Sequence, residues 1–369
     1  MTGVSNPEQI KGILHKSLKS LGSFEQCALL DYPSYLNIGD HLIWLGTIFY
    51  LTDVLKTKIN YAASIEDFSD SVMEQQIGKA PILFQGGGNF GDLWPKHQNF
   101  REQIISKYKD RPIFILPQSI YFEKQDNLLK AADIFNSHPN LTLFIRDNYS
   151  YELALKYFSN CQVIKTPDMA FQMVNMPELS FSLKPKHTIL YHCREDSELN
   201  QNFATNEIKL TDVVVQDWVS YKWLYRGKYR NFDQWYWRIP GIVKLVREGW
   251  QRGLSHPLER ISRYRWENSP TYTDKFNKLY HPTLHHNSWS LMHSGMFQLK
   301  RSRLVITNRL HGHILCLLLG IPHIFLPNAH HKNQAFYQTW TEEIPFCQFI
   351  EDAAQIPGVV QELLGDSVK

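Results

Sequence analysis

The chain has 369 residues, of which 43% are hydrophobic and 20% are charged. This length and balance are typical of a globular protein with two domains of ordinary size. The formal net charge of +3 is too small to indicate a nucleic-acid-binding protein. We therefore expect the basic excess to act locally, on an anionic substrate or an anionic surface.

The cysteine pattern and the apolar runs exclude further classes. The 5 cysteines lie far apart and form no CxxC pair, which argues against a disulfide framework and against a structural zinc site. The amino-terminal segment has no signal-peptide pattern. The longest apolar run, 314–321, is far shorter than the roughly 20 residues of a membrane-spanning helix. We expect a cytoplasmic protein, with peripheral membrane association as an option.

Strand-like and helix-like segments alternate along the first half of the chain. Helices are predicted at 8–22, at 42–55 after the turn Asn37-Ile-Gly-Asp40, and at 150–158 with Asp147 and Asn148 available as its cap. Strands are predicted at 27–30, 81–84, 112–116, 141–145 and 163–164. This alternation favours a parallel sheet with crossover helices. Each strand ends in a polar or glycine cluster, so we expect one edge of the sheet to bind a ligand.

A second series of strands follows a proline-containing linker at 174–186. It opens at 188–192 and resumes at 304–307 and 324–326. The predicted organisation is an N-terminal domain at 1–180, a C-terminal domain at 181–345 with an insertion at 217–290, and a C-terminal helix at 346–369 with the option of packing back on the N-terminal domain.

The segment 217–266 within the insertion is dense in Trp, Tyr, Arg and Lys. Three interpretations stay open: a local aromatic core with a solvated basic face, an acceptor-binding surface, or a segment that lies on a membrane.

The most informative cluster is Arg309-Leu310-His311-Gly312-His313, between the apolar runs 304–306 and 314–319. It therefore lies where a buried strand ends and a buried helix begins, a position at which open α/β sheets bind ligands. Arginine grips a carboxylate or phosphate with two parallel hydrogen bonds, and histidine carries a proton near neutral pH. We predict an anionic substrate and a proton transfer here. A metal on the two histidines is disfavoured, because no carboxylate or cysteine stands at ligand spacing.

Three N-terminal strand ends carry further candidates. Gly86-Gly87-Gly88-Asn89 lets the backbone approach a ligand closely, with a tight turn as the alternative. Asp40, beside His41, is a candidate base or hydroxyl-orienting group, with helix capping by Asn37 or Asp40 as the alternative. Arg146 is a candidate substrate-binding residue, with an ordinary salt bridge as the alternative.

Two candidates come from the C-terminal half. Arg194 follows the first strand of that half, where a role in a cleft and a structural role weigh equally. Lys332, next to His330 and His331, adds positive charge to the same edge as Arg309.

In this order, the motifs resemble the polysaccharide pyruvyl transferase family. The matching pieces are 37–40, 86–89, 116–119, 144–147 with Ser150, 167–168, 194–198, 307–313, 318–322 and Lys332. The resemblance implies an α/β fold of two Rossmann-like domains in a GT-B-like arrangement that face each other across a cleft. It also implies transfer of a pyruvyl group from phosphoenolpyruvate to two hydroxyls of a sugar, as a cyclic ketal. No cofactor and no metal are implied beyond that donor.

Carried over by position, the resemblance makes His311 the catalytic acid, and Arg194 and Arg309 the ligands of the donor's carboxylate and phosphate. We add Asp40 as a second catalytic residue. The predicted substrate-binding set is Arg194, Arg309, Leu310, His313, Lys332, Gly86, Gly87, Gly88, Asn89 and Arg146. The chain departs from the family pattern at Asn308, where an aspartate is usual, and in 217–290, where no motif matches.

Two other functions compete with this one. A GT-B glycosyltransferase could use the same scaffold and an arginine for a nucleotide diphosphate, but Asn333 and Gln334 stand where an acidic residue would hold the ribose. A non-catalytic glycan-binding protein would rely on the aromatic segment instead. The acceptor remains open between a free, a nucleotide-linked and a lipid-linked sugar.

Overall fold

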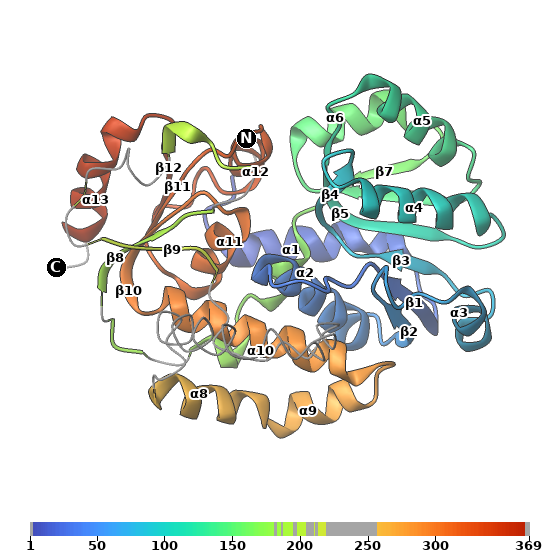
Figure 1. Cartoon of the computed structure of the whole chain (residues 1–369), viewed down its shortest axis with the longest axis horizontal. Coiled ribbons are helices and arrows are strands. Elements are labelled where there is room, and N and C mark those ends of the chain that lie inside the picture. Colours follow the sequence, from blue (N-terminus) through green and yellow to red (C-terminus); the bar gives the residue numbers. More distant parts are fainter. Residues whose placement is uncertain are drawn as a thin grey trace, which may run out of the picture.

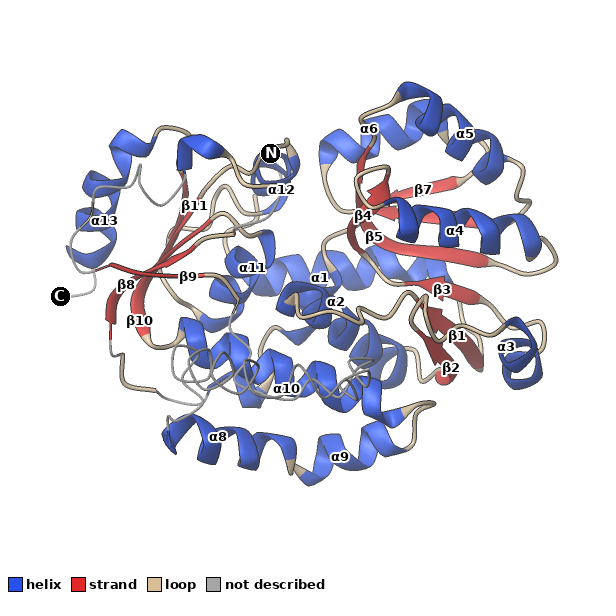
Figure 2. Ribbon diagram, in the orientation of Figure 1, coloured by secondary structure: helices blue, strands red, loops and turns tan. Residues whose placement is uncertain are grey.

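Two parallel β-sheets, one from each half of the chain, lie with helices between and around them (Figures 1 and 2). The computed structural model describes residues 3–180, 183–185, 187–194, 198–203, 210, 213–218 and 257–365. This architecture is the one expected of two Rossmann-like domains. Among the described residues, no helix is both long and apolar enough to cross a membrane.

The N-terminal sheet has the strand order β2-β1-β3-β5-β6-β7, with β4 paired to β5. Its strands are β1 (Gln26–Leu30), β2 (Lys58–Ala63), β3 (Ile82–Phe84), β4 (Gly87–Gly91), β5 (Ile113–Tyr121), β6 (Leu141–Ile145) and β7 (Gln162–Lys165). Its helices are α1 (Pro7–Leu18), α2 (Ile38–Phe49, continued by the π-helical Tyr50–Val54), α3 (Asp70–Ile77), α4 (Pro95–Lys107), α5 (Gln125–Asn136) and α6 (Asn148–Tyr157). The chain turns to opposite sides of β1, so the sheet has a topological switch point between β1 and β3.

The predicted strands and helices of this half are present, and strand burial and helix capping explain why they form. All residues of β3 and β6 are buried, which accounts for their continuous apolar runs. Asn37 caps α2 by accepting from the Gly39 amide, and Asp147 caps α6 by accepting from the Ser150 amide.

The glycine segment, for which a close approach to a ligand or a tight turn was expected, is largely a strand. It enters β4, which pairs with β5 and ends at Gly91 with φ +129°. A Cβ on Gly91 would lie 1.7 Å from the Tyr121 carbonyl oxygen, so this close backbone pairing requires glycine.

The C-terminal sheet has the order β12-β11-β10-β8-β9, and every described pair in it is parallel. Its strands are β8 (His187–His192), β9 (Val213–Gln216), β10 (Ser302–Thr307), β11 (His323–Phe325) and β12 (Cys347–Phe349). Three helices accompany it: α11 (Leu310–Leu319), α12 (Lys332–Trp340) and α13 (Ile356–Gly365). The switch point of this sheet lies between β8 and β10.

The end of the chain belongs to this second sheet, which corrects the predicted boundary at 345. The strand β12 pairs with β11, and α13 packs on β10 and β11. The apolar face of α13, with Ile356, Val360 and Leu363, shares a core with Ile189 and Ile306. The segment 346–369 therefore does not pack back on the N-terminal domain in its described part.

Helices from the predicted insertion join the two halves. They are α8 (Pro257–Glu267), α9 (Pro270–Asn277) and α10 (Pro282–Leu299), and α10 packs along α2 (Figure 1). Trp266 and Trp289 stack at 4.0 Å, and each indole N–H donates to the other residue's carbonyl. In the part 257–266 of the predicted aromatic segment, Trp266 thus belongs to a buried aromatic core, which agrees with the first of the three interpretations, whereas 219–256 lie outside the described residues.

Candidate active site

A cavity of about 630 Å³ is lined by residues of both halves. The N-terminal half contributes Tyr35, Leu36, Asn37, Asp40, Gly88, Asn89, Trp94, His97 and Arg146, and the C-terminal half contributes Arg194, Glu198, Asp217, Trp218, Arg309, Leu310, His311, Asn328, Lys332 and Asn333. Most of these residues follow the carboxyl ends of strands, including β1, β8 and β10 at the two switch points. A ligand in this cavity would therefore be reached by strand ends of both sheets.

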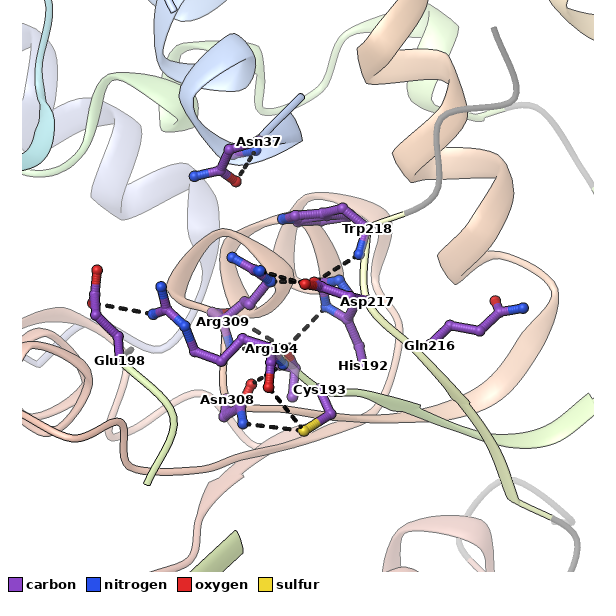
Figure 3. Close-up of polar contacts among 12 residues, drawn as sticks. Asn37, His192, Cys193, Arg194, Glu198, Gln216, Asp217, Trp218, Asn308 and Arg309 are labelled. Atoms are coloured by element: carbon purple, nitrogen blue, oxygen red, sulfur yellow. Dashed lines mark hydrogen bonds and ion pairs between the residues drawn. The ribbon is translucent and has the colours of Figure 1, made fainter. Parts of the chain in front are cut away.

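Arg309 is the N-cap residue of α11, and its guanidinium grips the Asp217 carboxylate through two nitrogens (Figure 3). The Nη2–Oδ2 distance is 2.5 Å. Asp217 follows β9, a strand that the sequence analysis did not predict, and it supplies the charge partner that Asn308 does not provide. Asn308 is fully buried and accepts the Arg194 amide at 2.9 Å, which ties the end of β10 to the end of β8.

Arg194 extends from the end of β8 and pairs with Glu198, with 3.1 Å between Nη1 and Oε2 (Figure 3). Because β8 and β10 are adjacent and parallel, with His192 opposite Thr307, Arg194 and Arg309 leave the sheet side by side. Both guanidiniums line the cavity. Two arginines from neighbouring strand ends can bind two anionic groups of one small molecule.

His311 lies in the first turn of α11, with its Nε2 3.5 Å from Oδ2 of Asp168. The same carboxylate accepts Arg146 Nη1 at 2.6 Å and the Ala170 amide at 2.8 Å. Burial alone would raise the pKa of Asp168, but His311, Arg146 and the amide outweigh it and lower that pKa to about 2. The Asp168 carboxylate is thus an anionic neighbour of the His311 ring.

The tight approach of α2 to α11 depends on Gly39. A Cβ at this position would lie 2.5 Å from Nδ1 of His311, so a glycine is needed where the two helix starts meet. The next residue, Asp40, lines the cavity, and its Oδ2 accepts the Asn37 amide nitrogen at 2.8 Å. Asn37 is therefore the helix cap, and Asp40 lies at the cavity. His41 is buried and contacts Ser288 and the Tyr35 carbonyl, and burial lowers its pKa to about 4.

Lys332 reaches from α12 to the N-terminal half, where its Nζ donates to the Gly88 carbonyl at 3.0 Å. Burial lowers the pKa of Lys332. Gly88 and Asn89 line the cavity together with Lys332 and Arg146. Gly86 and Gly87 do not line this cavity: a Cβ added to Gly86 would lie 2.6 Å from the Pro117 carbonyl oxygen, and one added to Gly87 would lie 3.6 Å from Asp40 Oδ1.

His313 lies apart from the cavity, contrary to its predicted substrate-binding role. Residues two apart on a helix point to opposite faces, so His313 faces the core when His311 faces the cavity. Its Nδ1 bonds His323 Nε2 at 2.8 Å, its Nε2 bonds the Thr341 hydroxyl at 3.1 Å, and its ring stacks on Phe325. Burial and the neighbouring histidines lower the pKa of His313, and its Nδ1 also lies 3.5 Å from the Cys347 sulfur.

Several cavity residues were not predicted as site residues from the sequence. They are Tyr35, Leu36, Asn37, Trp94, His97, Glu198, Asp217, Trp218, Asn328 and Asn333. Asp168, which contacts His311, was also not predicted as a site residue, although Pro167-Asp168 was one of the matching motifs. Their positions in the sequence could have indicated them, because these residues follow predicted strand ends or lie in the aromatic segment.

The comparisons with known proteins agree with this arrangement. The family model for polysaccharide pyruvyl transferases matches residues 37–331, which is most of the chain and includes strands of both sheets. EpsO of Bacillus subtilis (strain 168), provisionally named a pyruvyl transferase, is 30% identical over 326 residues, covering 88% of each chain. Pyruvyl transferase 1 of Schizosaccharomyces pombe is 28% identical over 324 residues, covering 86% of this chain and 70% of the yeast protein.

Among solved structures, a functionally uncharacterised protein from Klebsiella pneumoniae is similar with a TM-score of 0.53. It covers 95% of this chain and 100% of its own, at 19% sequence identity, so the likeness concerns the fold alone. The range matched by the family model contains the cavity residues from Asn37 to Asn328. The chain therefore belongs to the polysaccharide pyruvyl transferase family.

Proposed function

We propose that the protein transfers a pyruvyl group from phosphoenolpyruvate to a sugar of a polysaccharide or its precursor, and forms a cyclic pyruvate ketal. The observation that carries this proposal is the placement of Arg194, Arg309 and His311 around one cavity, at the ends of two adjacent strands and the start of one helix. The two domains take a GT-B-like arrangement, with this cavity as the cleft between them.

The donor binds on the C-terminal side. Arg194 and Arg309 bind its carboxylate and phosphate, and Lys332 and Arg146 add positive charge at the cavity wall. Leu310, which is 8% exposed and lines the cavity, supplies an apolar contact for the methylene carbon. The positive charges of these side chains stabilise the phosphate as it leaves.

His311 is the acid. Its imidazolium donates a proton to the methylene carbon of phosphoenolpyruvate, which becomes a methyl group and leaves the adjacent carbon electrophilic. The Asp168 carboxylate, which is ionised at neutral pH, stabilises the imidazolium before this transfer. Arg146 therefore holds the carboxylate that stabilises the acid, and it also lines the cavity.

The acceptor approaches from the N-terminal side, along Asn89 and Asp40. One hydroxyl attacks the electrophilic carbon, the bond to phosphate breaks, and the second hydroxyl closes the ring as the ketal. Asp40 accepts the proton of one attacking hydroxyl. The scheme uses phosphoenolpyruvate as its donor substrate and needs no further cofactor.

The test is a donor comparison. The protein is incubated with phosphoenolpyruvate and a panel of galactosides, glucosides and mannosamine derivatives, in free, nucleotide-linked and lipid-linked form. We expect phosphate release together with the mass gain of one pyruvyl ketal on the acceptor. Sugar transfer from a nucleotide sugar would instead identify a glycosyltransferase, and inertness to both donors would indicate a glycan-binding protein.

A further inference from the structure

The proposed ketal closure removes two hydroxyl protons from the acceptor. In balance, one of these protons replaces the proton that His311 gives to the methylene carbon, and the other leaves on the released hydrogen phosphate. Each must first be carried away from its hydroxyl by a base, and Asp40 accounts for one of them. We propose that His97 accepts the other hydroxyl proton and that Asp31 positions its ring. This inference rests on the proposed function of the cavity.

His97 is placed on the acceptor side of the cavity. It lies in the first turn of α4 and lines the cavity together with Asp40 and Asn89, and its side chain is 16% exposed. The ring of Tyr35, another lining residue, meets it edge-on at 6.1 Å. His311 enters the same cavity from the C-terminal half, so an acid and a base would be supplied from opposite domains.

Asp31 is held in place to orient this imidazole. It follows β1 directly with φ +70°, a left-handed backbone conformation that is uncommon for a residue other than glycine. Its carboxylate is almost fully buried and accepts His97 Nδ1 at 2.7 Å. The other oxygen accepts Asn89 Nδ2 at 3.1 Å and lies 3.5 Å from Arg101 Nη2. Strained backbones of this kind persist where the surroundings hold them, often at functional sites.

The hydrogen bonds determine which ring nitrogen is free to react. A carboxylate only accepts, so Nδ1 of His97 carries the hydrogen that binds Asp31. The lone pair is then on Nε2, for which the described part of the chain provides no hydrogen-bond partner. A histidine whose Nδ1–H is bound by a buried aspartate, and whose ring lines a substrate cavity, can act as a general base through Nε2.

The surrounding side chains hold the Asp31 carboxylate in one orientation. Arg101 is completely buried, lies over the rings of Phe84 and Phe90, and donates to the Asn89 side chain at 2.8 Å. Asn89 therefore connects the glycine segment, Arg101 and Asp31 into one network that ends at His97. If His97 only linked β1 to α4, it would need only its Nδ1–H donor. A general base also needs the basic Nε2, so a variant that keeps the donor and lacks the basic nitrogen separates the two roles.

The experiment compares His97→Asn, whose amide can keep the hydrogen bond to Asp31 but lacks a basic nitrogen, with the wild type. We expect kcat for ketal formation to fall by about 10²–10⁴-fold, while phosphoenolpyruvate affinity and the unfolding temperature stay unchanged. His97→Gln, a second variant should His97→Asn fold poorly, loses activity likewise. Asp31→Asn lowers kcat without raising KM for phosphoenolpyruvate. His286→Asn, on the outer part of α10, is the matched control and keeps full activity.

The outcomes separate the inference from the function on which it rests. If the wild type forms the ketal and His97→Asn keeps more than about a tenth of its kcat, His97 is not the base, although the proposed function stands. If the wild type forms no ketal from phosphoenolpyruvate with any acceptor of the panel, the proposed function and this inference both fail.

Discussion

Replacing Gly39 by alanine tests whether the position of His311 determines the rate. The added Cβ would lie 2.5 Å from Nδ1 and 2.6 Å from both Cβ and Cγ of His311, whereas ordinary contact begins near 3.4 Å. The imidazole must therefore move by roughly 1 Å, and a displacement of that size in a reacting group lowers a rate by about 10²-fold. Because the clash includes the histidine Cβ, rotation of the ring alone does not relieve it.

The assay is kcat for ketal formation with saturating phosphoenolpyruvate, together with the donor affinity and the unfolding temperature of each variant. Gly12→Ala is the matched control, because Gly12 lies in α1 with no atom within 4 Å of an added Cβ. We expect this control to keep wild-type kcat and to gain about 0.5–1 kcal/mol in stability from the better helix former. A folded Gly39→Ala protein with wild-type kcat would refute the reasoning that the α2–α11 contact positions the acid.

Three further predictions concern the same cavity. His311→Asn should abolish turnover while donor affinity is largely kept, as measured by product formation and by equilibrium binding of phosphoenolpyruvate; retained turnover would assign the acid to another group. Arg309→Lys should lower kcat by about 10²–10³-fold, because an ammonium cannot reproduce the two-nitrogen grip on Asp217 and the phosphate; a loss below threefold would remove Arg309 from the donor site. Because the pKa of Asp168 is lowered to about 2 in the folded protein, its charge stabilises the fold by about 2 kcal/mol above pH 4, and this contribution is lost as the pH falls from about 4 to 2. Acid unfolding of the wild type and of Asp168→Asn should therefore differ at pH 7 and converge at low pH, and a constant difference would contradict the assignment.

The strand ends of the cavity could be predicted from the sequence because of their patterning. Long apolar runs such as 141–145 indicate strands buried on both faces, and the polar residue that follows each run then lies at the ligand edge. Arg146, Arg194 and Arg309 all reach the cavity for this reason. Helix capping by Asn37 and Asp147 is equally local, so it was readable without tertiary information.

The missed parts depend on contacts between distant segments. The strands β2, β9 and β12 are edge or near-edge strands whose short sequences carry little pattern of their own. Asp217 is 92 residues from Arg309, and their pairing exists only once β9 lies beside β8. His313 was assigned to the cavity because it lies in the same motif as His311, although helix geometry directs the two rings to opposite sides.

The most direct test of the central claim is the isotope content of the ketal formed in D₂O. The wild-type protein, phosphoenolpyruvate and a competent acceptor are equilibrated in D₂O, and the product is analysed by mass spectrometry alongside the released phosphate. Because a solvent-exchanged His311 delivers the proton to the methylene carbon, we predict one deuterium in each ketal methyl group and one phosphate per ketal. A ketal without deuterium, or sugar transfer from a nucleotide sugar with phosphoenolpyruvate left intact, would contradict this account.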